Sequence, residues 1–172
     1  MMRPRQHFDR RGAAAAEMAL VMPLLLVILF GSVEAGNYFY NEHILVKAVR
    51  DGARYAARQD WSFYGCSGAP TGPVVANTRA LVRTSLLSGG NNRVTGLDDI
   101  EITLSTSCAT TATDDASATE NMSGIYRGKA GGAPVVTVNA SMPYVPLIGT
   151  LFGFSGIGLN LNASQQAAVM GL

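Results

Sequence analysis

Residues 10–36 of this chain are RRGAAAAEMALVMPLLLVILFGSVEAG, and this stretch decides how the rest is arranged. The apolar run from Ala13 to Gly36 predicts a helix of roughly 36 Å, at about 1.5 Å per residue. That length crosses a bilayer hydrocarbon core of about 30 Å. The residues before the run carry a clear excess of positive charge, from Arg3, Arg5, Arg10 and Arg11 against Asp9. This charge pattern predicts a single span with a cytoplasmic N-terminus and the remaining chain on the opposite side.

Glu17 is the unusual residue of the span, because a carboxylate inside an apolar helix costs a few kcal/mol in lipid. Two interpretations remain open. In the first, Glu17 lies near the positive end of the helix dipole, which stabilises a carboxylate. In the second, cleavage between Gly12 and Ala13 frees an α-amino group, and Glu17 pairs with that ammonium in its own or a neighbouring subunit.

The N-terminal third of the chain resembles a known family. Gly12, Ala13 and Glu17 stand where type IV pilin-like precursors carry the glycine before the cut, the first mature residue and the fifth-position glutamate. Further blocks resemble the TadE-like minor pseudopilins of the tight-adherence (Tad, or Flp) pilus system: Ala19–Leu26, Phe30–Gly36 and Ala48–Ala57. The resemblance implies a pilin-like subunit that is cut by a prepilin peptidase and takes part in pilus biogenesis and surface adhesion.

The same resemblance implies a location and a set of partners. The location is the bacterial inner membrane, with a single pass, a periplasmic C-terminal domain and incorporation into an extracellular pilus. The implied partners are the prepilin peptidase, the major Flp pilin, other minor pseudopilins, the Tad assembly platform proteins and the lipid bilayer. A formal net charge of +1 gives no support for nucleic-acid binding.

Two alternatives to the filament subunit stay open. One is a bitopic membrane protein whose distal domain binds a ligand or adhesion target and never joins a filament. The other is a secreted domain released by signal peptidase after Val33-Glu34-Ala35. The length of the apolar run and the acid inside it argue against an ordinary signal peptide.

Two residues of the span each have two interpretations. Pro23 removes a helical hydrogen bond and predicts a kink, which is either harmless or part of filament packing. Glu34 lies near the outer boundary of the span, where it is either an interfacial charge or a subunit contact.

The chain divides by pattern into four parts: a basic leader at 1–12, a transmembrane half-helix at 13–36, an amphipathic continuation at 37–59 and a small domain at 60–172. The continuation is predicted from apolar or small residues at helical spacing, namely Tyr38, Leu45, Val49, Gly52 and Ala56. Within the domain, the sequence pattern predicts one further helix at 74–87, ended by Gly89-Gly90, and strands at 100–107, 134–142 and 159–170. The expected fold class is therefore α+β, a long N-terminal helix packed on a small antiparallel sheet.

Cys66 and Cys108 are the two cysteines, and both follow the span. On the oxidising side of the membrane they predict a disulfide, with two free thiols as the alternative. Closing a loop of that length would stabilise the domain by roughly 4 kcal/mol in the chain-entropy model.

Catalysis and metal binding find little support in the residues. His7 lies in the leader and His43 on the helix, so the distal domain has no histidine for a nucleophile or a zinc ion. We expect no enzyme, no cofactor and no metal. Asp114, Asp115 and Glu120, in the exposed loop expected at 109–133, either bind calcium or form a solvated acidic loop, and their spacing matches no calcium motif. The same two interpretations apply to Asp98, Asp99 and Glu101.

The segment from Tyr144 to Ile157 is apolar, but Pro146 and several glycines prevent a second regular span. It is either an exposed membrane or partner contact, or a loop folded over the core.

Overall fold

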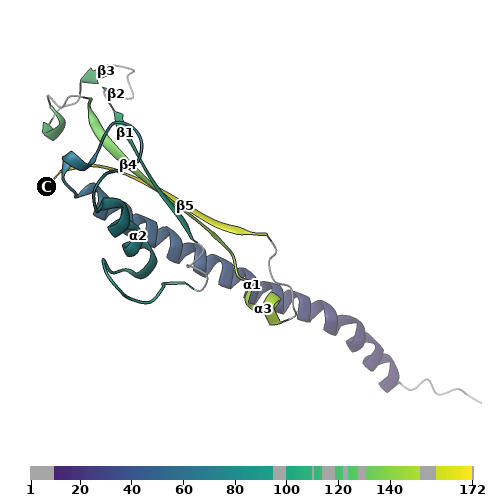
Figure 1. Ribbon diagram of the computed structural model, residues 1–172. Helices are drawn as coiled ribbons and strands as arrows, with labels where there is room; N and C mark the ends of the chain where they lie inside the picture. Colours follow the sequence, from purple (N-terminus) through teal and green to yellow (C-terminus); the bar gives the residue numbers. More distant parts are fainter. Residues whose placement is uncertain are drawn as a thin grey trace, which may run out of the picture.

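The computed structural model describes residues 10–94, 100–109, 111–113, 119–121, 124–127, 131–151 and 158–171. A long helix, α1 (Arg10–Ala57), forms the length of the molecule, and a three-stranded sheet lies along its C-terminal half (Figure 1). The N-terminal half of α1 extends away from the sheet. The chain therefore has the predicted α+β architecture.

The remaining elements follow in a simple order. They are η1 (Trp61–Phe63), α2 (Val74–Thr84), β1 (Glu101–Ala109), β2 (Thr111–Thr113), β3 (Thr119–Asn121), η3 (Gly124–Tyr126), β4 (Ala133–Pro143), α3 (Leu147–Leu151) and β5 (Asn160–Ala168). The main sheet has the order β1-β4-β5, with both pairs antiparallel. A small β2-β3 sheet lies at the end of the molecule opposite the extended half of α1 (Figure 1).

The main sheet buries one face, as the alternation of its strands predicts. On β1, Ile102 and Leu104 are buried and pair with the buried Ala140 and Val138 of β4. Glu101, Thr103 and Ser105, which alternate with them on β1, are exposed. The sheet thus packs on α1 with its apolar face and leaves a polar face outward.

The C-terminal part of α1 forms the other side of this core. Leu45 and Val49 are each 1 % exposed and Ala56 is fully buried. A β-carbon on Gly52 would lie 2.6 Å from Cγ2 of Val82, so the glycine allows α2 to approach α1 closely. These positions confirm the inward face that the helical spacing predicts.

Helix α2 ends earlier than the sequence predicts. We expected it to continue to Leu87 before Gly89-Gly90, but it ends at Thr84. Ser85 adopts a left-handed conformation with φ of 69°, and its N–H bonds the carbonyl of Leu81. The Thr84 hydroxyl then accepts from the N–H of Leu86 at 3.3 Å. These local hydrogen bonds end the helix without the help of glycine.

The loop expected at 109–133 is partly ordered into regular structure, so that expectation was too simple. Its described residues include the short strands β2 and β3 and the 3₁₀ turn η3. Strands of three residues carry too little alternation to stand out in a sequence rich in Thr, Ser and Ala. The short helix α3 was missed in the same way.

Candidate functional site

The N-terminal half of α1 is an exposed surface in the described part of the chain. Every residue from Gly12 to Val33 is exposed, and we call this range the bare half. Its large side chains include Leu20, 80 % exposed, and Val27, 69 % exposed. By length and composition this helix can cross a membrane, with a mean hydropathy of 2.4 over its best window of 18 residues. Such a surface needs lipid or other apolar helices around it, because exposing it to water costs about 25 cal/mol per Å².

The predicted cleavage junction lies at the start of this surface. Helix α1 begins at Arg10, so Gly12 and Ala13 belong to its first turns. Both residues are exposed, and a β-carbon on Gly12 would have no other atom within 4 Å. The junction is therefore not packed against any described residue.

Glu17 lies on the bare half, four residues after Ala13, and is exposed. Residues four apart lie on the same helix face, so an amino group at Ala13 would be a neighbour of this carboxylate. The ion pair among the described residues joins Asp51 and Arg93 at 3.3 Å. Within that part of the chain Glu17 thus has no ion-pair partner.

Pro23 also lies on the bare half, and α1 continues across it as one helix. A proline donates no backbone N–H, so the carbonyl of Ala19 lacks its usual helical partner. The kink at Pro23 stays a prediction.

Glu34 marks the point where the bare half meets the rest of the molecule. Its carboxylate accepts hydrogen bonds from the Tyr144 hydroxyl and from the backbone N–H groups of Leu147 and Ile148, the last two at 3.0 and 2.8 Å. The Asn37 amide donates to the Tyr144 hydroxyl at 2.9 Å. Glu34 therefore holds the first turn of α3 against α1.

Sequence reasoning singled out Glu34 but missed its partners. Tyr144 lies 110 residues away in the chain, and no local spacing connects the two. The one available signal was Tyr144 itself, a side chain with a polar hydroxyl at the start of an otherwise apolar segment just after β4. Burial raises the pKa of the Tyr144 phenol, and its hydrogen bond to the Glu34 carboxylate raises it further, so the hydroxyl stays a donor at neutral pH.

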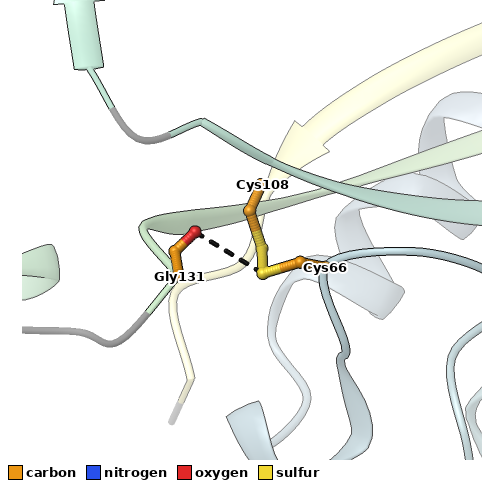
Figure 2. The surroundings of a disulfide bond; sticks show 3 residues. All are labelled: Cys66, Cys108 and Gly131. Carbon is orange, nitrogen blue, oxygen red and sulfur yellow. Dashed lines mark hydrogen bonds between the residues drawn. A yellow bond between two sulfur atoms is a disulfide. The ribbon is translucent and has the colours of Figure 1, made fainter.

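The predicted disulfide is present between Cys66 and Cys108 (Figure 2). It joins the loop after η1 to the end of β1 across 42 residues. The Gly131 carbonyl oxygen lies 3.5 Å from the Cys66 sulfur, and Figure 2 shows the two groups facing each other. A disulfide sulfur carries no hydrogen, so we treat this approach as a van der Waals contact.

Gly131 is required at this contact. Its φ is 92°, a conformation that side chains rarely adopt, and a β-carbon there would lie 2.8 Å from the Cys66 sulfur. The disulfide is therefore packed against the chain that leads into β4.

The described residues bring no other chemistry together. No group of three or more His, Cys, Asp or Glu side chains is placed among them as a metal ion would need. His43 is exposed on α1, and Glu101 is exposed on β1. His7, Asp98, Asp99, Asp114 and Asp115 lie outside the described residues, and of Glu120 the backbone in β3 is described.

Comparison with known proteins agrees with the N-terminal geometry. Residues 12–54 match the family model described as TadE-like protein. The match begins at the Gly12 junction and covers the bare half and most of the packed part of α1. No curated protein and no solved structure matches the chain.

Proposed function

Because residues 12–54 match the family model described as TadE-like protein, we propose that this chain is a minor pseudopilin of a Tad pilus. In this proposal a prepilin peptidase cuts between Gly12 and Ala13, and the mature subunit contributes to pilus biogenesis and surface adhesion. The observation that carries the proposal is the division of α1 into a bare apolar half and a half packed into a small domain. A permanent anchor and a filament subunit both need the bare apolar half. Only the role of filament subunit also gives Glu17 a function.

The bare half suits a subunit that moves from lipid into a filament. Lipid tails and apolar helices are nearly equivalent surroundings for such a helix, so extraction into a bundle of similar helices has a small hydrophobic cost. Glu17 then acquires a partner in the ammonium that cleavage creates at Ala13 of its own or a neighbouring subunit. Leaving this acid unpaired among packed helices would be costly, so the pairing favours the correct axial position.

The remaining partners follow from the same proposal. Before cleavage the precursor sits in the bacterial inner membrane with its basic leader in the cytoplasm and the domain in the periplasm, where a disulfide persists. The subunit contacts the major Flp pilin, sister pseudopilins and the assembly platform. A kink at Pro23 would adjust the path of the helix in the bundle.

The deciding experiment changes Gly12 to Val. No described atom lies within 4 Å of a β-carbon at Gly12 or at Gly31, so Gly31→Val is a matched control on the same exposed helix surface. We expect Gly12→Val to block cleavage, so that the protein keeps residues 1–12 by intact mass and pilus output falls. Gly31→Val should be cut normally.

The outcomes separate the competing functions. A wild-type protein that keeps Met1 or Met2 in cells containing the matching peptidase would refute the pseudopilin and leave a bitopic binding or adhesion protein. A mature protein that begins after Ala35 would indicate a secreted domain. Glu17→Gln adds a second test, because we expect normal cleavage but reduced incorporation into pili.

A further inference from the structure

The segment after β4 turns alternate side chains toward the core and toward the outside. Tyr144 is 5 % exposed and Pro146 is among the fully buried residues, whereas Val145 is 44 % exposed and Leu147 is 58 % exposed. The described part of this segment therefore covers the core and also exposes apolar side chains, while a membrane or partner contact stays a prediction. One set of side chains covers the core, and the other presents an apolar surface.

Glu34 determines where this surface lies along the axis of α1. Its carboxylate accepts hydrogen bonds from the N–H groups of Leu147 and Ile148, which places the start of α3 at Glu34. Figure 1 shows α3 beside α1. From Ala13 to Glu34 a helix rises roughly 32 Å, close to the about 30 Å thickness of a hydrocarbon core. The start of α3 thus lies where the bare half leaves the bilayer.

Other exposed apolar groups occur close to this level. Phe39 and Tyr40 follow Glu34 by roughly 8 to 9 Å along α1 and are 65 % and 66 % exposed. Leu159 is 47 % exposed, and its carbonyl accepts from the Tyr144 N–H at 2.8 Å, which places it beside this segment. Aromatic and apolar side chains at this depth are typical of membrane interfaces.

We propose that Val145 and Leu147 insert into the headgroup and acyl boundary of the leaflet that faces the domain, as a second membrane contact beside the span. The occupant is phospholipid, because the surface continues the bare half and carries no charged side chain from Val145 to Leu151. The nearest acid, Glu34, already accepts three hydrogen bonds from within the chain. This inference rests on the membrane anchoring in the proposed function.

The contact would give the domain a fixed orientation on the membrane. The short segment would be held by α1 through Glu34 and by lipid through Leu147, so the domain could not pivot freely on its helix. This second membrane contact at Val145 and Leu147 would keep the polar face of the sheet at a constant angle to the membrane before assembly.

A spin-label experiment on the full chain in phospholipid vesicles tests this. Single cysteines at Leu147, Leu25 and Ile125 would carry the label, since Cys66 and Cys108 are joined to each other. The three positions are similarly exposed, at 58 %, 55 % and 56 %. Leu25 lies on the bare half, and Ile125 lies next to Tyr126, which stacks on Trp61 beyond the far end of α1.

We expect the ratio of collisions with lipid-soluble oxygen to collisions with a water-soluble nickel reagent to be several-fold higher at 147 than at 125. Glu34→Ala should move the ratio at 147 toward that at 125, because α3 loses its attachment to α1. Leu147→Cys keeps the backbone N–H that Glu34 binds, so the test position does not remove the contact it reports.

The other outcomes overturn the inference in distinguishable ways. If 25 contacts lipid but 147 contacts water, the second contact does not exist while the span stands. If 147 is shielded from both reagents, the surface faces protein instead. If 25 itself contacts water, the membrane span fails and the inference fails with it.

Discussion

Two leucines on one helix show how differently the halves of α1 are used. Leu25 is 55 % exposed and Leu45 is 1 % exposed, although both belong to the same unbroken helix. The first half is apolar on all sides, whereas the second has an apolar stripe with Lys47, Arg50 and Arg54 outside it. The distribution of apolar residues around the helix, and not their number, distinguishes a surface made for lipid or other helices from one made for a folded domain.

The two halves should also differ in what keeps them helical. In the second half, packing on β4, β5 and α2 supplies the stability, as it does for most helices in globular proteins. The residues of the first half are exposed instead. Its helicity should depend on an apolar environment. In such an environment no solvent hydrogen-bonds the backbone, so the helix itself must satisfy its N–H and C=O groups. The halves should therefore respond independently to changes in the domain.

Removing the disulfide should have the largest effect on this comparison. Replacing Cys66 and Cys108 together by serine should lower the free energy of unfolding of the domain by about 4 kcal/mol, because the unfolded chain gains freedom over the 42-residue separation. In detergent micelles, Trp61 reports domain unfolding, since its indole N–H bonds the Val169 carbonyl at 3.2 Å. Far-UV circular dichroism reports the helix.

The double variant should lose the Trp61 signal at lower denaturant while the bare half keeps its helical signal. Loss of both signals in one transition would show that the halves are coupled. Unchanged stability would show that the disulfide adds little to the folded core.

Truncating matched leucines should give the next largest effect. Leu45→Ala should lower the free energy of unfolding of the domain by about 3 kcal/mol, because it leaves a cavity in the core. Leu25→Ala is the control, with the same chemical change on an exposed site of the same helix. Denaturant titration should show almost no change for this control. Equal losses for the two variants would mean that the bare half packs on the domain in solution.

Glycine replacements should sharpen the comparison further. Gly52→Ala should cost about 1 to 2 kcal/mol, because the new methyl group would approach Cγ2 of Val82 at 2.6 Å and Cγ2 of Thr78 at 3.2 Å. Gly31→Ala meets no atom within 4 Å and should instead favour the helix by about 0.5 to 1 kcal/mol. The unfolding temperature of the domain should fall for Gly52→Ala, whereas the effect of Gly31→Ala should appear only in the helical circular-dichroism signal of the bare half. A stabilising Gly52→Ala would show that α2 can shift away from α1 at little cost.

The local parts of this structure were accessible from the sequence because their signals are local. The apolar run gave the bare half, the helical spacing of Leu45, Val49 and Ala56 gave the packed face, and alternation gave the three main strands within a few residues. The pairing of Cys66 with Cys108 followed from their number and compartment and not from any knowledge of their positions.

The parts that could not be predicted depend on contacts between distant residues. The hydrogen bond between Tyr144 and Glu34 exists because β4 ends beside the C-terminal end of the bare half, which no periodicity encodes. The end of α2 depends on Ser85, which adopts a left-handed conformation stabilised by its neighbours. The sequence had instead indicated that the helix would end at Gly89-Gly90. The three-residue strands β2 and β3 are defined only by their pairing with each other, which the sequence does not show.

The smallest predicted effect concerns the end of the packed half. The Tyr64 hydroxyl donates a hydrogen bond to the Ala56 carbonyl near the C-terminus of α1. Tyr64→Phe should therefore cost about 1 kcal/mol at pH 7, because it removes one half-buried hydrogen bond. Burial raises the pKa of the Tyr64 phenol from 10.0 to about 12, with a smaller contribution from Tyr55.

This pKa shift gives the prediction a pH signature. A phenol whose folded pKa exceeds its unfolded pKa contributes stability that is fully present below pH 10 and is lost as pH rises toward 12. Wild type should therefore lose stability relative to Tyr64→Phe across that window, and the difference between them measured at pH 7 should shrink. Denaturant titrations followed by circular dichroism from pH 8 to pH 12 would measure it. A difference that stays constant over this range would show that Tyr64 is not held against the end of α1.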